Sequence, residues 1–326
     1  MSDFRTLINN NLSDHKLELQ QSILTLGSCF AEVIGTKLQK QKIKALTNPF
    51  GATYNPTSIH KLIQYAIENK VVFEKDTVQH QDIFSHYDFH SEFSSLTEVD
   101  LKDKILKAVS STHFFLQKAD WMILTYGTAW VYERKDTGEI VSNCHKIPAY
   151  QFTKSLLSQK KIEESFEQVY KALKKLNPAI KIILTVSPVR HLKDTLELNS
   201  VSKAALRLAC HHITSSHADV LYFPAYEIMM DDLRDYRFYK SDMIHPSELA
   251  EDYIWEKFID RYANPQLKKF LNEWREISTA LAHRPFHSAS VAHQNFLQEL
   301  LRRLEGLKGI VNIDLEKKAI LDQLIQ

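Results

Sequence analysis

Strand-like and helix-like segments alternate along most of this chain, and this alternation is the strongest constraint on its fold. Four short apolar runs predict buried strands, each followed by a glycine, serine or proline: residues 22–26, 121–126, 180–186 and 220–223. Four segments with helical periodicity lie between or after them: residues 30–40, 101–119, 161–176 and 201–216. This alternation predicts an α/β fold in which helices cover both faces of a mainly parallel sheet.

A small hairpin is predicted directly after the second of these strands. Residues 131–134 and 140–141 have strand-like sequences, and Asp136, Thr137 and Gly138 between them favour a tight turn. A hairpin in this position commonly shapes the rim of a site.

The chain changes character near residue 264. Beyond it the sequence has only helical patterns, at 266–281 and 291–307. We therefore expect an α/β domain over residues 1–263 and a helical C-terminal appendage over 264–326. The apolar spacing in the appendage favours packing against the main domain over an oligomer seam, although a homo-oligomer is left open.

Composition argues against several classes of partner. The 41 Lys and Arg residues nearly balance the 40 Asp and Glu residues, so no strong net charge favours nucleic acid or an anionic membrane surface. No run of about 18 apolar residues occurs, and the first twenty residues lack the pattern of a secretory signal. Three widely spaced cysteines predict neither disulfides nor a zinc site. We therefore expect a cytoplasmic protein.

Ser28 is the first candidate for chemistry, because it lies between a predicted strand and a predicted helix. Ligand sites in parallel sheets form where loops leave the carboxyl ends of strands, and a helix N-terminus there favours an anion. Ser28 is therefore a candidate nucleophile, while the alternative is that it only caps the helix. We expect the neighbouring Cys29 to point into the core between helix and sheet.

A serine nucleophile requires a base, and Asp242 and His245 are suited to that role. They are three residues apart before a predicted helix that begins near Ser247. This spacing lets the carboxylate orient the imidazole and stabilise its charged form. The pattern alone is weak evidence, because the chain contains 15 histidines.

Together these motifs resemble the GSCFA family, which is grouped with the SGNH/GDSL hydrolases. Residues 27–31 spell GSCFA, and the resemblance continues through 48–51, 127–130, 187–191 and 242–246. It implies a flavodoxin-like three-layer sandwich of the SGNH hydrolase type. It also implies Ser28 as nucleophile, Asp242 and His245 as its triad partners, and Gly51 as a backbone donor to the oxyanion hole.

One departure from that pattern concerns the oxyanion hole. SGNH enzymes usually carry Gly-x-Asn where this chain has Gly127, Thr128 and Ala129, so the Asn donor is missing. Loss of one such donor typically costs about 10²- to 10³-fold in rate. Asn143 and Asn48 are the candidate replacements. We expect an oxyanion hole formed from four residues, Ser28, Gly51, Thr128 and Asn143.

A histidine-rich segment raises the question of a metal. His86 and His90 have a helical spacing, with His80 and Asp88 nearby, but the segment has no zincin-type glutamate and no strong helix signal. We therefore expect no metal and no cofactor. Asn48, His90 and His145 are instead the predicted substrate-binding residues.

The predicted function is that of a serine hydrolase acting on a small acyl ester, such as an acetyl ester of a sugar or another metabolite. Ser28 attacks the carbonyl, His245 moves the proton and Asp242 orients His245. Transfer of the acyl group to an alcohol uses the same residues, so the sequence leaves hydrolase and acyltransferase open. The alternative is a non-catalytic module that binds a ligand in the same crevice.

Overall fold

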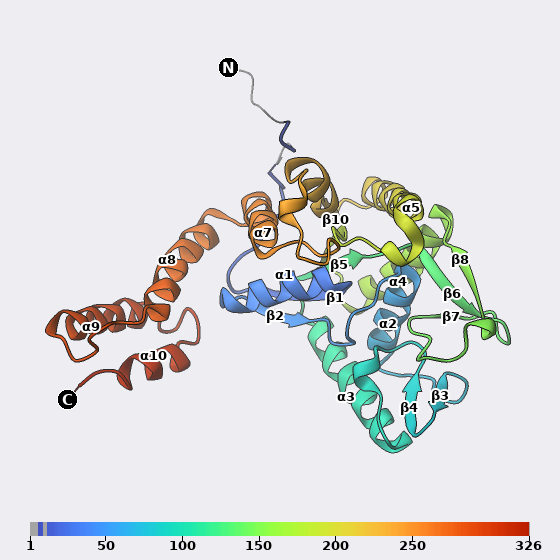
Figure 1. The fold of residues 1–326 in the computed structure, drawn as a ribbon, viewed down its shortest axis with the longest axis horizontal. Coiled ribbons are helices and arrows are strands. Elements are labelled where there is room, and N and C mark those ends of the chain that lie inside the picture. Colours follow the sequence, from blue (N-terminus) through green and yellow to red (C-terminus); the bar gives the residue numbers. More distant parts are fainter. Residues whose placement is uncertain (1–5, 9–11, 326) are drawn as a thin grey trace.

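Five parallel strands form the central sheet in a computed structural model that describes residues 6–8 and 12–325 (Figure 1). The strands are β1 (Ser22–Gly27), β2 (Lys44–Thr47), β5 (Trp121–Tyr126), β9 (Lys181–Val186) and β10 (Val220–Phe223). They lie in the order β2-β1-β5-β9-β10, with every neighbouring pair parallel. Numbered along the chain this is the flavodoxin-like order 2-1-3-4-5, so the predicted α/β fold is confirmed.

Helices cover both faces of this sheet and complete the three layers. One face carries α2 (Pro56–Glu68), α3 (Glu98–Leu116), α4 (Gln159–Leu176) and α5 (Thr195–Ser216). The other carries α1 (Cys29–Lys40) and α7 (Glu248–Tyr262). Side chains alternate between faces along a strand, so Leu24 packs in the first core and its neighbour Ile23 in the second. Both cores are closed to solvent, which explains the continuous apolar runs in the sequence.

Several elements were not predicted from the sequence. The edge strand β2 is four residues long, polar in part and only half-buried, so its sequence carries no strand signal. Strands β3 (Thr77–His80) and β4 (Ile83–His86) form a separate hairpin.

The predicted hairpin is confirmed as an antiparallel pair, β6 (Trp130–Arg134) and β7 (Ile140–Val141). An additional strand, β8 (Phe152–Leu156), pairs with the other side of β6. β8 was not predicted, because its alternation of apolar and polar residues is short.

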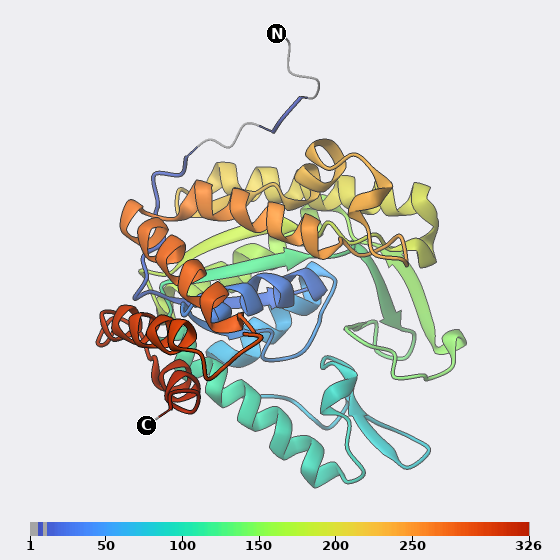
Figure 2. The ribbon, with the colours of Figure 1, turned by 60° about the vertical axis from the view of Figure 1, so that its left-hand side comes forward.

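The C-terminal helices form the expected appendage. They are α8 (Pro265–Ala282), α9 (Val291–Glu305) and α10 (Asp314–Leu321), and they project from the side of the molecule away from β6–β8 (Figure 1, Figure 2). Their apolar faces join the core beneath α1 and α7. Trp274 is buried there, donates its indole N–H to Lys40 O at 2.9 Å, and lies under the Lys42 ammonium.

The division at residue 263 remains a prediction, and the predicted first domain includes residues 1–5 and 9–11, which lie outside the described residues. Among the helices that the structure describes, none is long and apolar enough to span a membrane.

We expect Trp274→Ala to lower the free energy of unfolding by about 3–5 kcal/mol, because it removes a large buried ring and one hydrogen bond. Phe286→Ala is the control, since Phe286 is fully exposed on the same appendage and its loss should change stability by less than about 0.5 kcal/mol. Urea unfolding followed by circular dichroism measures both. Equal stability of the two variants would show that the appendage is not part of the core.

Candidate active site

The site is located by the topology of the sheet. The strand order reverses direction between β1 and β5, and ligands of open α/β sheets bind at such a switch point, outside the carboxyl ends of the strands. Ser28 directly follows β1 and Gly127 directly follows β5. A Cβ atom on Gly127 would lie 3.3 Å from Ser28 Cβ, so the two loops are packed against each other. The predicted nucleophile therefore lies at the switch point.

Ser28 is buried and serves as the N-cap of α1. Its hydroxyl accepts a 3.4 Å hydrogen bond from the N–H of Phe30, and its own N–H donates to Thr125 O at 3.1 Å. Gly27 before it has φ of +136°, and a Cβ there would lie 2.2 Å from Thr125 O. Only glycine allows β1 to approach β5 this closely and still turn into the helix.

Cys29 lies in a different place from the one expected. It is half-buried at the first position of α1, and its Sγ lies 3.6 Å from Tyr54 Oη. The first turn of a helix at a strand end projects from the sheet, so this thiol contacts the loop after β2 instead of the core.

The loop after β2 is tied to the Ser28 turn through Asn48. Its amide oxygen accepts from Gly27 N–H at 3.0 Å and its amide nitrogen donates to Ser28 O at 3.5 Å. Asn48 therefore holds the turn in place. Gly51, three residues beyond, donates its N–H back to Asn48 O at 2.8 Å.

Thr128 is engaged at both of its polar groups. Its N–H donates to Tyr54 O at 3.1 Å, and its hydroxyl lies 3.0 Å from that of Ser202 on α5. Its assignment to the oxyanion hole remains a prediction, as does that of Gly51. Both backbone donors already have acceptors in this structure.

Asp242 and His245 form a hydrogen-bonded pair. Asp242 Oδ2 lies 2.7 Å from His245 Nδ1, and Asp242 Oδ1 accepts from the N–H groups of Ile244 and His245. The backbone N–H of His245 has the largest effect on the pKa of Asp242, followed by the N–H of Ile244 and then the imidazole. Together they lower this pKa to about 2. The carboxylate is therefore ionised at neutral pH, and it fixes the His245 ring through Nδ1, while Nε2 forms no hydrogen bond to the described residues.

The turn that carries this pair is joined to the loop after β9. Arg190 donates its N–H to Ile244 O at 3.2 Å. Within the described part of the chain no hydrogen bond links His245 to Ser28, and the expected contact between them remains a prediction. Catalytic hydrogen bonds are often longer before substrate binds.

Sequence reasoning gave no role to His191, which lies beside Ser28. A Cβ on Gly127 would lie 3.2 Å from His191 Nε2 and 3.3 Å from Ser28 Cβ. The ring also packs edge-on against Tyr54, with centroids 5.6 Å apart. Burial, then the charges of Lys203 and His245, lower the pKa of His191 to about 4, so its ring is neutral at pH 7. In the sequence, His191 is the last residue of the family motif at 187–191, but the motif alone does not indicate its function.

Lys203 is a second residue that the sequence analysis missed. It is buried on α5, and its Nζ donates to Gly127 O at 2.8 Å and to Ser187 O at 2.7 Å. It therefore links the carboxyl ends of β5 and β9. A signal was present, because Lys203 lies in the buried stripe of α5 with Leu206 and Cys210. A lysine in such a stripe requires buried acceptors.

A cavity of about 550 Å³ opens beside these loops. It is lined by Tyr54 from the loop after β2, by Asn143 and His145 from the segment after β7, and by His90 and Lys193. Asn143 Oδ1 accepts from His145 N–H at 2.9 Å, and His145 Nε2 lies 2.8 Å from His86 O. Three predicted residues, His90, His145 and Asn143, thus share one cavity. Asn48 lies behind the Ser28 turn instead.

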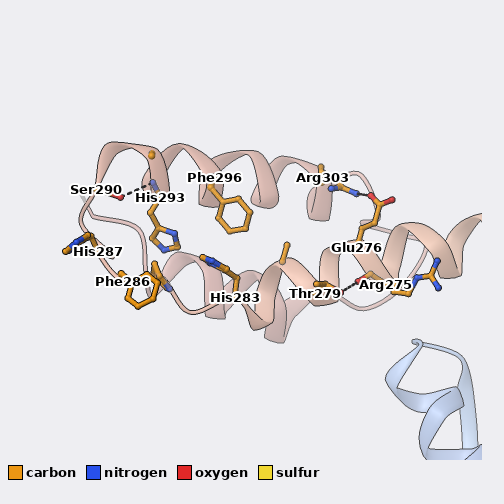
Figure 3. Close-up of a pocket in the computed structure, with 13 residues that line it drawn as sticks. Arg275, Glu276, Thr279, His283, Phe286, His287, Ser290, His293, Phe296 and Arg303 are labelled. Carbon is orange, nitrogen blue, oxygen red and sulfur yellow. Dashed lines mark hydrogen bonds and ion pairs between the residues drawn. The ribbon is translucent and has the colours of Figure 1, made fainter. Parts of the chain in front are cut away.

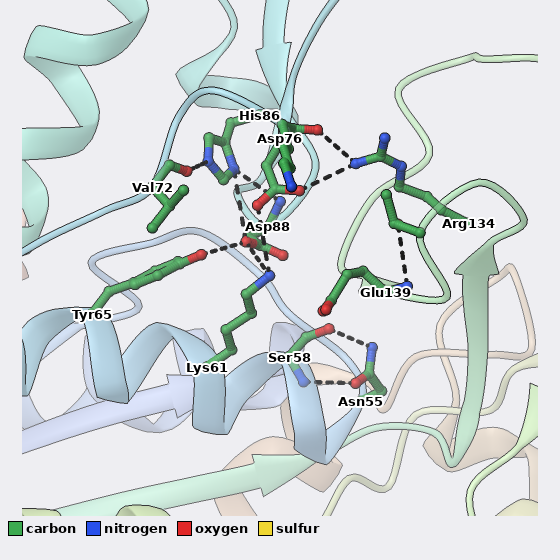
Figure 4. A network of polar contacts seen from close by, with 12 residues as sticks. Asn55, Ser58, Lys61, Tyr65, Val72, Asp76, His86, Asp88, Arg134 and Glu139 are labelled. Carbon is green, nitrogen blue, oxygen red and sulfur yellow. Dashed lines mark hydrogen bonds and ion pairs between the residues drawn. The ribbon is translucent and has the colours of Figure 1, made fainter.

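The histidine-rich segment forms a polar network (Figure 4). Ligand atoms of Asp76, His86 and Asp88 lie within 4.8 Å of one another, as a metal site requires. However, Lys61 Nζ lies 2.8 Å from Asp88 Oδ2, and Arg134 contacts Asp76 at 3.2 Å. Two side-chain cations therefore already balance the two carboxylates.

Another cavity, of about 890 Å³, lies between α8 and α9 (Figure 3). It is lined by His283, His293 and Phe296, whose rings pack together, and by the exposed Phe286. The appendage is anchored at Lys40, the last residue of α1, whereas Ser28 caps the first turn of that helix. This cavity is therefore separate from the site at the switch point.

The fold and the site define a class: a three-layer α/β protein with a parallel sheet and a buried serine at its switch point. The chain belongs to the GSCFA family, whose model matches residues 22–258. The C-terminal domain of GSCFA domain proteins matches residues 274–326. A search of curated proteins finds no match.

Solved structures with a similar arrangement include two esterases. A carbohydrate esterase family 3 protein from Talaromyces cellulolyticus has 9% identity and a TM-score of 0.35, over 78% of this chain and 99% of that one. An acetyl xylan esterase from the rumen bacterium Butyrivibrio proteoclasticus has 11% identity and a TM-score of 0.40, over 79% and 66%. Similarity at this level is no evidence for a shared activity.

We expect Lys203 to make stability depend on pH, because burial lowers its pKa from 10.5 to about 7. Between these values the unfolded chain holds the proton and the folded chain does not, so raising the pH favours folding. From pH 7 to 9 the free energy of unfolding should rise by about 2 kcal/mol more for the wild type than for Lys203→Met. Urea titrations at both pH values measure this, and equal slopes would contradict it.

Proposed function

We propose that this protein is a serine hydrolase of the SGNH type that cleaves a small acyl ester, with Ser28 as nucleophile, His245 as general base and Asp242 as its orienting carboxylate. The observation that carries the proposal is the position of Ser28 at the switch point of the sheet, in a family whose motifs include both the GSCFA turn and the Asp-x-x-His block. Membership of that family supports the assignment of these three roles.

The reaction takes place in two steps. Ser28 Oγ bonds to the acyl carbon while its proton passes to His245 Nε2, and His245 then gives that proton to the departing alcohol oxygen. A water molecule next loses a proton to His245 and attacks the acyl-enzyme, and His245 returns the proton to Ser28 Oγ. The ionised Asp242 stabilises the imidazolium in both steps. If an alcohol replaces the water, the same residues catalyse acyl transfer.

The substrate is proposed to lie in the cavity of about 550 Å³ next to Tyr54. Its volume suits a small molecule, and His90, His145 and Asn143 supply polar groups at its walls. Tyr54 connects the cavity to the reacting serine, because its carbonyl binds Gly127 N–H at 2.7 Å and its hydroxyl faces Cys29. Acetyl and other short acyl groups on a sugar or metabolite are the proposed substrates.

A non-catalytic binding module is the second candidate, and one observation favours it. The Ser28 hydroxyl is engaged as a helix cap, and the described residues show no hydrogen bond from His245 to it. A serine that only caps a helix stabilises the protein by about 1 kcal/mol and has no reactivity above that of an ordinary hydroxyl. Labelling separates these two functions.

A fluorophosphonate should label the wild-type protein at Ser28, because a serine paired with a base is far more nucleophilic than a capping one. Ser28→Ala should abolish the label and lower ester turnover by several powers of ten, and His245→Ala should be about as damaging. Asp242→Asn should be severe but less so. Peptide mapping by mass spectrometry locates the adduct.

The control for this experiment is Cys29→Ala, which removes the adjacent side chain and should retain both label and turnover. If Cys29→Ala is the change that abolishes activity, the nucleophile is misassigned. A wild-type protein that takes no label and cleaves no ester across a broad panel is a binding module.

We also expect ester cleavage to survive a strong chelator, because the proposed mechanism activates Ser28 through His245 alone. Turnover of an acetyl ester before and after incubation with EDTA measures this. Loss of activity that added zinc restores would instead assign a catalytic metal to Asp76, His86 and Asp88.

A further inference from the structure

His191 has a polar atom that the mechanism above leaves unexplained. Its Nε2 is buried and has no hydrogen-bond partner within the described part of the chain. Burying a nitrogen without a partner is unfavourable, so such atoms are uncommon unless a ligand or water binds them. This atom packs on Gly127, on the side where Ser28 Cβ also lies. Both atoms would contact the same Cβ on Gly127, so His191 Nε2 lies near the side chain that would carry the acyl group.

The oxyanion hole needs a donor of this kind. The usual Asn is replaced by Ala129, and the Ser28, Gly51 and Thr128 N–H groups already donate to Thr125, Asn48 and Tyr54. A tetrahedral intermediate carries a full negative charge on its oxygen, and a buried donor aimed at that oxygen stabilises it strongly. Among the described side chains that would contact a Cβ on Gly127, His191 has a buried nitrogen without a partner.

We propose that His191 is a catalytic residue that donates its Nε2–H to the oxyanion formed on Ser28, in place of the missing asparagine. This inference rests on the proposed hydrolase function. No proton is transferred in this role: the N–H remains on His191 while the carbonyl oxygen gains and then loses its negative charge.

The two histidines at this site therefore have different roles. His191 is neutral at pH 7 because burial lowers its pKa to about 4, and a neutral imidazole is a suitable donor and a poor proton acceptor. His245 is fixed by Asp242 through Nδ1, which leaves its Nε2 to accept a proton. Where the buried amine of Lys203 is protonated, its charge further lowers the pKa of His191.

Two substitutions test the donor. His191→Leu removes the N–H, and His191→Gln retains an N–H near the position of Nε2. With p-nitrophenyl acetate, His191→Leu should lower kcat by about 10²- to 10³-fold with little change in KM. His191→Gln should have a kcat close to that of the wild type, because its amide still donates an N–H. By contrast, His245→Gln should not restore kcat, because a glutamine cannot accept the proton.

The matched control is His217→Leu. His217 lies between α5 and the start of β10, at the amino ends of the strands and away from Ser28, and it contacts Glu167, so its variant should retain wild-type kcat. Thermal melts establish that each variant is folded. If His191→Leu does not fold, a crystal structure of the wild-type protein labelled by the fluorophosphonate serves as the test instead. There the phosphoryl oxygen should lie about 2.7–3.1 Å from His191 Nε2.

The outcomes separate this inference from the proposed function. An active wild type with an equally active His191→Leu, or a phosphoryl oxygen bound elsewhere, overturns the role of His191 and leaves the hydrolase intact. Loss of activity in His191→Gln equal to that in His191→Leu also overturns the donor role and indicates that the imidazole acts as a base. A wild type that is neither labelled nor active overturns both.

Discussion

The close approach of the β1 backbone to β5 at Gly27 is the contact on which the site depends. No side chain fits there, because a Cβ would lie 2.2 Å from Thr125 O. This approach places Ser28 beside Gly127, where the loops of two neighbouring strands meet. The positive φ of Gly27 also ends the strand abruptly, so the next residue, Ser28, caps α1 and the helix N-terminus points into the switch point.

Buried polar side chains then hold the loops around this turn. Asn48 ties the loop after β2 to Gly27 and Ser28, and Lys203 ties the ends of β5 and β9 together. Both satisfy backbone groups that would otherwise be buried without partners at the ends of strands. Such fully bonded networks rigidify a site, and a rigid site can hold reacting groups in a fixed geometry.

His191 and His245 have different environments because they lie in different loops around Ser28. His191 lies in the loop after β9 and packs against Gly127 and Tyr54. Burial there lowers its pKa, so its ring is neutral. His245 lies on an exposed turn, where Asp242 remains ionised and can support a charged imidazole. In the proposed mechanism, the buried histidine acts as a hydrogen-bond donor and the exposed one transfers the proton. The proposed chemistry requires both roles at one serine.

The sequence by itself determined the parallel α/β fold, since buried strands must be continuously apolar. It also indicated Ser28, Asp242 and His245 as candidates, since the strand-to-helix turn at Ser28 and the Asp-x-x-His block are each local patterns. It did not reveal β2 or β8, because short edge strands are half-exposed and carry little apolar pattern. Only the tertiary structure decided which polar groups of the described residues are already bonded, such as the N–H of Thr128, and which are left unpartnered, such as the Nε2 of His191. Hydrogen-bond satisfaction depends on contacts between residues far apart in the chain, and periodicity or motif spacing does not record them.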